Sequence, residues 1–204
     1  MLPLGHIAGG YLSAKALLKI VPNNFTEAEK EKLSYWGAFF GFLPDIDIFY
    51  AFYKSAALTI NHSVANHRLY FTHTPLFWLL AGLLIYFLFK RPIQKIFGLI
   101  VLAGAWSHMA LDSIDYGVRW LWPFKSAPYA IITDGLKSQS LPAGFFNYWF
   151  GFLKYYFYTP TFCFEILIII LGLYVFLQSF RSLNKFGLPR LSQVRGKMRG
   201  FLEP

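Results

Sequence analysis

Residues 96–112 read IFGLIVLAGAWSHMALD, and this stretch carries the two features on which the fold depends. The segment 96–111 is strongly apolar and is expected to form a transmembrane helix. His108 and Asp112 stand four residues apart near its end, so both side chains lie on one face of that helix. Two histidines at the same spacing bind zinc in metalloproteases. The stretch therefore predicts a membrane helix that ends in a candidate metal site.

The composition of the whole chain agrees with a membrane protein. Of its 204 residues 56% are hydrophobic and 14% are charged, whereas an average soluble domain has about 25% charged residues. No linker-like or low-complexity stretch divides the chain. The single cysteine, Cys163, excludes a disulfide or a thiolate zinc site within one chain. The first apolar stretch contains Lys15 and Lys19 and lacks a clear cleavage site, so no cleavable signal peptide is expected.

Two further segments resemble transmembrane helices. The segment 162–178 is the most apolar, and its one formal charge is Glu165 near the start. The segment 72–89 has 18 residues, close to the roughly 20 that a crossing helix needs. The aromatic stretch 145–158 suits the membrane interface, either as an anchoring belt or as a groove for acyl chains.

The first part of the chain predicts two weaker helices. The segment 4–20 places most of its apolar residues near one helical face. Thr26 and Glu29 have the spacing of a capping box and start a second helix, which becomes apolar after residue 32 and ends or kinks at Pro44. The expected fold is therefore all-α: an integral membrane bundle of about five membrane-embedded helices.

Basic residues gather at one end of these helices. They are Lys15, Lys19, Lys30, Lys32, Lys90, Arg91 and Lys95. The positive-inside rule places this end in the cytoplasm, together with a basic juxtamembrane tail at 181–204 that follows the metal-site domain 1–180. The tail is more typical of contact with anionic lipid than of nucleic-acid binding. Five crossings then leave the N-terminus outside a multi-pass inner (plasma) membrane protein and the C-terminus in the cytoplasm.

Histidines and aspartates form a series at the opposite, outer ends of the helices. The candidate metal ligands are His6, Asp45, His67, His73, His108 and Asp112. Imidazole and carboxylate hold zinc and related divalent ions, and ionisable groups at membrane depth are expensive unless they have a function. An isolated histidine, or the Pro-Asp-x-Asp run at 44–47, is more often structural or solvated. Their joint occurrence at one membrane level favours a metal site.

The motifs resemble those of predicted membrane-bound metal-dependent hydrolases, a family typified by a bacterial inner-membrane protein of the DNA-damage response. The shared elements are GHIAGG at 5–10, GFLPDID at 41–47, HR at 67–68, THT at 72–74, His-x-x-x-Asp at 108–112 and WPF at 122–124. The family spaces its two middle histidines more closely than His67 and His73. Either this segment is non-helical, or one of the pair is not a ligand.

The resemblance extends more distantly to zinc-dependent phospholipases C and single-strand nucleases. It implies hydrolysis of a phosphoester, with metal activating water and neutralising the phosphate. Those enzymes use further histidines downstream, whereas this chain has none after His108. One or two divalent ions, expected to be zinc, therefore fit better than a trinuclear cluster.

The leading interpretation is a membrane-embedded metal-dependent hydrolase that cleaves a phosphoester in a lipid or lipid-linked substrate at the outer face. Asp45 or Asp47 is the candidate base that takes a proton from water. Arg68 either contacts the phosphate or pairs with Asp112 or Asp115.

Two other classes of protein compete with the hydrolase. A non-catalytic protein would use its metal to hold the helices together. A metal transporter ranks last, because it would place ligands at the bilayer midplane. Glu165 is either a ligand or base of the site or a solvated residue near a helix end. The substrate, the metal count and the oligomeric state stay open.

Overall fold

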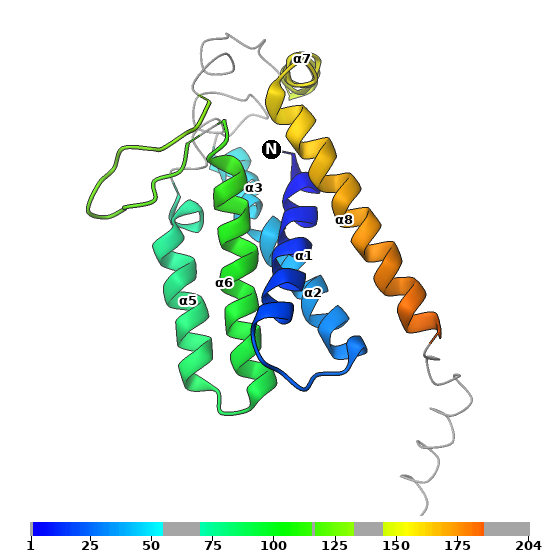
Figure 1. The fold of residues 1–204 in the computed structure, drawn as a ribbon. Helices are drawn as coiled ribbons and strands as arrows, with labels where there is room; N and C mark the ends of the chain where they lie inside the picture. The colour runs from blue at the N-terminus through cyan, green and yellow to red at the C-terminus, as the bar shows by residue number, and fades with distance from the viewer. Residues whose placement is uncertain (1, 55–69, 116, 133–144, 186–204) are drawn as a thin grey trace, which may run out of the picture.

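The computed structural model describes residues 2–54, 70–115, 117–132 and 145–185 (Figure 1). Within these ranges the fold is all-α, without strands, as the sequence predicts. The elements are α1 (Pro3–Ile20), α2 (Glu27–Phe42), η1 (Leu43–Ile46), α3 (Asp47–Lys54), η3 (Phe71–His73), α5 (Pro75–Leu88), α6 (Pro92–Asp112), α7 (Phe145–Tyr156) and α8 (Pro160–Lys185).

Helices α1, α2, α5 and α6 form a tight bundle in which glycines let the backbones touch (Figure 1). A Cβ added to Gly10 of α1 would lie 2.3 Å from the carbonyl oxygen of Gly37 in α2. One added to Gly104 of α6 would lie 2.7 Å from the same oxygen. Because lipid tails are as apolar as the helix surfaces, helices in a membrane associate through close packing of small residues. These contacts bring the starts of α1 and η1 to the end of α6.

Local signals in the sequence set the limits of α2. The Oγ1 of Thr26 accepts a hydrogen bond from the Glu29 backbone N–H at 3.3 Å, and Glu29 Oε2 accepts one from the Thr26 N–H at 2.8 Å. The predicted capping box is therefore confirmed. At the other end α2 stops at Phe42, and Pro44 lies in the 3-10 turn η1. The predicted break at Pro44 is confirmed as well, and it aims the following aspartates out of the helix.

Among the described residues, two helices are long and apolar enough to cross a membrane: Pro92–Asp112 and Pro160–Asn184. Only 17% of the apolar stretch in the second helix, Pro160–Asn184, is buried inside the protein. Such an exposed apolar helix is typical of contact with lipid rather than of a soluble core. Figure 1 shows α8 leaning away from the bundle toward its C-terminal end.

The expected span 72–89 is wrong as a single helix. Residues Phe71–His73 form the separate turn η3, and Thr74 is extended at φ −108° and ψ 125° before Pro75 starts α5. A residue that precedes proline disfavours helical backbone, which explains the break. The 14 residues of α5 rise about 21 Å at 1.5 Å per residue, less than the roughly 30 Å of a hydrocarbon core. Five full crossings therefore do not follow from the lengths of the described helices.

Candidate metal centre

The helix α6 presents His108 and Asp112 at its last turn, and α1 presents His6 at its first. The His6 and His108 rings stack with their centroids 3.7 Å apart. The Nε2 of His6 lies 3.3 Å from one Asp112 oxygen, and the Nε2 of His108 lies 3.6 Å from the other. All three side chains are completely buried. Residues more than a hundred positions apart in sequence thus form one polar cluster.

Two short 3-10 helices, η1 and η3, add further side chains to the cluster. Asp45 of η1 places Oδ1 3.6 Å from His108 Nε2, and Oδ2 3.9 Å from His6 Nε2. The Nε2 of His73, in η3, lies 3.5 Å from Asp45 Oδ1. Three imidazole nitrogens and two carboxylates consequently face one another. Residues 67–69 lie outside the described ranges, so the two alternatives for the spacing of His67 and His73 stay predictions.

These donor atoms fit a divalent metal ion. Donors that share an ion at about 2.0–2.2 Å stand about 3.4 Å apart in a tetrahedral arrangement, close to the 3.3–3.6 Å separations found here. The Nε2 atoms of His6 and His108 are buried and have no hydrogen-bond partner among the described residues, an arrangement that costs free energy unless something binds them. Two overlapping sets of three ligands are present, His6, His108 and Asp112, and Asp45, His73 and His108.

Hydrogen bonds behind two of the histidines fix how their rings point. The Nδ1 of His73 lies 2.8 Å from Asp47 Oδ2, and Thr72 Oγ1 also donates to that carboxylate. The Nδ1 of His108 lies 2.8 Å from the carbonyl oxygen of Gly41. A histidine that donates through Nδ1 turns the lone pair of Nε2 toward a metal, as metal-bound histidines do. The two candidate bases are thus separated: Asp45 faces the cluster, and Asp47 lies behind His73.

The same carboxylates set the charge of His73. Burial lowers the pKa of His73, but the hydrogen bonds with Asp45 and Asp47, together with the negative charges of Asp47 and Asp112, outweigh burial and raise the pKa to about 9. Without a metal, a proton on this imidazole balances part of the negative charge of the cluster. A metal would replace that proton, because histidine binds metals in its neutral form.

The cluster is most open on the side of Asp45. This side chain is 13% exposed, whereas the other residues of the two ligand sets are at most 1% exposed. Ile46, the next residue in the chain, is 48% exposed, and Phe49 of α3 is 66% exposed. Phe71, directly before the turn that carries His73, is 59% exposed. The segments that carry Asp45 and His73 therefore also expose large apolar side chains.

Three further sequence candidates are His67, Arg68 and Asp115, and the structure describes only the last of them. His67 and Arg68 lie outside the described ranges. Asp115 is buried just beyond the end of α6 and belongs to neither ligand set. The pairing of Arg68 with Asp112 or Asp115 stays a prediction.

Glu165 has a role that the sequence did not reveal. The interpretation as a solvated side chain is wrong, because Glu165 is 1% exposed. Its carboxylate accepts hydrogen bonds from the backbone N–H of Leu2 at 3.1 Å and of Gly5 at 3.2 Å, and from the hydroxyl of Tyr156. A carboxylate at a helix N-terminus satisfies unpaired N–H groups and interacts favourably with the helix dipole. Glu165 therefore fixes the first turn of α1, which carries His6.

The fold and the cluster together define a helical membrane protein with buried histidines and aspartates at one end of its helices. The chain matches the family of the YdjM inner membrane protein over residues 1–184, and it belongs to that family. It is accordingly an inner membrane protein, as the motifs predict. Comparisons with curated proteins and with solved structures found no match.

Proposed function

We propose that this protein is a membrane-embedded, metal-dependent hydrolase. The observation that carries the proposal is the convergence of three imidazole Nε2 atoms and two carboxylates, with the rings of His73 and His108 aimed by hydrogen bonds from behind. This donor set favours zinc or a similar divalent ion, and the overlapping ligand sets accommodate one or two ions. A divalent ion held there supplies Lewis acidity toward a water and a phosphoryl oxygen.

Three residues have separate proposed roles in hydrolysis. Asp45 is the most exposed carboxylate of the cluster, and it is placed to take a proton from an attacking water. Asp47 holds the His73 ring, so it positions a ligand rather than meeting the substrate. Arg68, five positions before His73 in sequence, is proposed to bind the phosphate.

Exposed apolar side chains on the segments that carry Asp45 and His73 support an amphiphilic substrate. Ile46, Phe49 and Phe71 lie close in sequence to these two residues, and their apolar surface suits the acyl or isoprenoid part of a lipid. We therefore assign the substrate to phosphoesters of lipids or lipid-linked molecules. In the proposed topology the chain crosses the membrane several times, the cluster lies at the outer face, and the C-terminal tail is cytoplasmic.

A structural metal site is the second candidate, and the burial of the cluster favours it. His6, His108 and Asp112 are completely enclosed, and together with Asp45 and His73 they link α1, η1, η3 and α6. Structural sites fill their coordination with protein ligands and stabilise the fold outright.

Metal analysis and hydrolysis assays on the purified protein in lipid nanodiscs test both candidates. The hydrolase should contain stoichiometric metal and release phosphate or a phosphorylated headgroup from a panel of phospholipids and isoprenoid diphosphates. His108→Ala should lose both the metal and the activity. Ser107→Ala, one position away on α6, should keep both, because its hydroxyl donates to the Gly104 carbonyl oxygen within the same helix. A metal-replete wild type that cleaves nothing in the panel, with stability that depends on the metal, would favour the structural site.

A further inference from the structure

Residues 119–131 form a loop that is tied firmly to the end of α6. Val118 and Tyr129 pair through two backbone hydrogen bonds of 2.9 Å at its base. The backbone N–H of Ile131 donates to the Ser113 carbonyl at 2.7 Å, and the indole N–H of Trp120 donates to Ser113 Oγ at 2.8 Å. These contacts fix the direction in which the loop leaves the helix.

The outer part of the loop carries large apolar side chains that the described part of the chain leaves exposed. Phe124 is 92% exposed. The others are Leu121 at 61%, Trp122 at 38%, Tyr129 at 60% and Ile131 at 65% exposed. So many exposed apolar side chains on one short loop indicate a contact surface rather than chance exposure. The Trp-Pro-Phe motif at 122–124 lies within this surface and has no part in the metal cluster.

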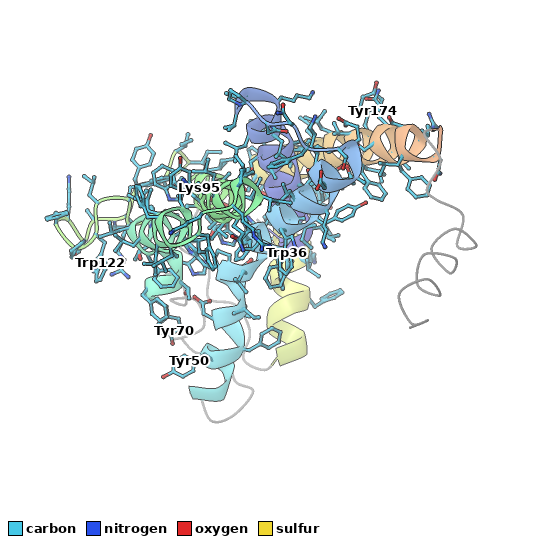
Figure 2. All side chains as sticks on the ribbon, turned by 90° about the horizontal axis from the view of Figure 1, so that it is seen from below. Trp36, Tyr50, Tyr70, Lys95, Trp122 and Tyr174 are labelled. Carbon is cyan, nitrogen blue, oxygen red and sulfur yellow. The ribbon has the colours of Figure 1, made fainter. Side chains whose placement is uncertain are left out.

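The position of the loop at the end of α6 indicates that the membrane surface covers its apolar side chains. Figure 1 shows the loop leaving the end of α6 sideways, beyond α5, and Figure 2 shows Trp122 far out on that side of the bundle. The 21 residues of α6 rise about 31 Å, which matches the hydrocarbon core of a bilayer, so a loop that leaves its end sideways lies at the membrane surface. Trp106 of α6, itself 37% exposed, packs 5.8 Å from Trp120 and makes the loop surface continuous with that of the membrane helix.

The chemistry of the loop agrees with the interfacial layer. Tryptophan and tyrosine concentrate where lipid headgroups meet acyl chains, and lysine there reaches lipid phosphates while its methylenes stay among apolar groups. Lys125 is exposed and shares with Trp120 and Tyr129 the wall of a hollow of about 410 Å³. An ammonium beside aromatic walls complements an anionic headgroup on a glycerol backbone.

We propose that the 119–131 loop inserts into the interfacial layer of the bilayer at the end of the molecule that holds the metal cluster. Phe124 and Leu121 enter the upper acyl region, and Lys125 contacts lipid phosphate. The loop anchors this end of the bundle at a fixed depth in the membrane. The inference depends on the membrane location of the chain and not on hydrolysis.

Depth-dependent quenching tests the insertion. The single cysteine is removed by Cys163→Ala, and Phe124→Cys is labelled with the fluorophore NBD in nanodiscs of phosphatidylethanolamine and phosphatidylglycerol. Insertion predicts blue-shifted emission, stronger quenching by lipids with a doxyl group at carbon 5 than at carbon 12, and several-fold weaker quenching by aqueous iodide than at an Asn24→Cys reference. Because Phe124 is almost fully exposed, labelling it should leave the Tm of the Cys163→Ala protein unchanged.

Two results would overturn the proposal. Iodide quenching at position 124 equal to that at Asn24 would place the loop in water. Protection from iodide without quenching by either doxyl lipid would mean that a second copy or another protein covers the loop. A label at Leu173→Cys, 55% exposed on α8, supplies the reference for deep lipid contact. Hydrolysis is not measured in this experiment, so its result stands whether or not the proposed activity is found.

Discussion

At the scale of single residues, the two aspartates after Pro44 differ in what they touch. Asp45 lies within 3.6 Å of two imidazole Nε2 atoms, whereas Asp47 contacts the opposite nitrogen of His73. A group that binds the metal and a group that aims a ligand should respond differently to substitution. The pair therefore offers an internal control.

Asp45→Asn should remove most metal and all hydrolysis, because it takes away a charged ligand. Asp47→Asn should keep the metal but weaken its affinity about 10- to 100-fold, the usual effect of losing a group that orients a ligand. Titration of the apoprotein with zinc measures both. Equal loss of metal in the two variants would show that Asp47 is itself a ligand.

Glu165 should affect His6 through the first turn of α1. Glu165→Ala removes the acceptor of the half-buried Leu2 N–H, at a cost of up to about 1–3 kcal/mol for an unsatisfied group, whereas the Gly5 N–H keeps the Leu2 carbonyl oxygen at 3.1 Å as an acceptor. We expect a lower Tm and weaker zinc binding, and partial recovery of both in Glu165→Gln, which keeps one oxygen acceptor. Unchanged zinc affinity in Glu165→Ala would show that the carboxylate stabilises the fold without positioning His6.

At the scale of the helices, backbone contact between α1, α2 and α6 places the ligands. Gly10 and Gly37 leave no room for a side chain, since a Cβ on Gly37 would lie 2.3 Å from the Cβ of Ala14. A shift of one helix by a side chain's width would separate His6 from His108. The cluster thus depends on residues that lie in the middle of the helices, away from the ligands.

Gly37→Val should force α1 and α2 apart and destabilise the protein by at least the typical 1–3 kcal/mol of overpacking. It should also lower the metal content, although residue 37 touches no ligand of the cluster. Thermal unfolding in detergent and metal analysis check the two effects. Ala16→Val, on the exposed face of α1, is the control and should leave both unchanged. Normal metal content in a stably folded Gly37→Val protein would refute the link between packing and the site.

At the scale of the whole molecule, a bound metal should hold together α1, η1, η3 and α6, the elements that carry the candidate ligands. Removing it with a chelator should lower the Tm, because a ligand that binds only the folded state stabilises by about 2.7 kcal/mol at a concentration of 100 Kd. His108→Ala should show no further drop with the chelator. If the chelator leaves the Tm of the wild type unaltered, the cluster holds no metal that contributes to folding.

The sequence alone determined the helical fold and the family. Apolar segments, the capping box at Thr26 and the break at Pro44 are local features, and each depends on neighbours within a few residues. The spacing of His108 and Asp112 likewise determines that they share a helical face. These signals suffice to predict the helices and to select the histidines and aspartates.

Only the tertiary structure decided which groups meet. The separate environments of Asp45 and Asp47, the late start of α5 at Pro75 and the contact of Glu165 with the first turn of α1 were not predicted. Glu165 reaches a backbone N–H 160 positions away, and no local pattern encodes such a contact. This contact depends on how closely the helices pack. Contacts between distant segments form only when the glycine faces of the helices bring their backbones together.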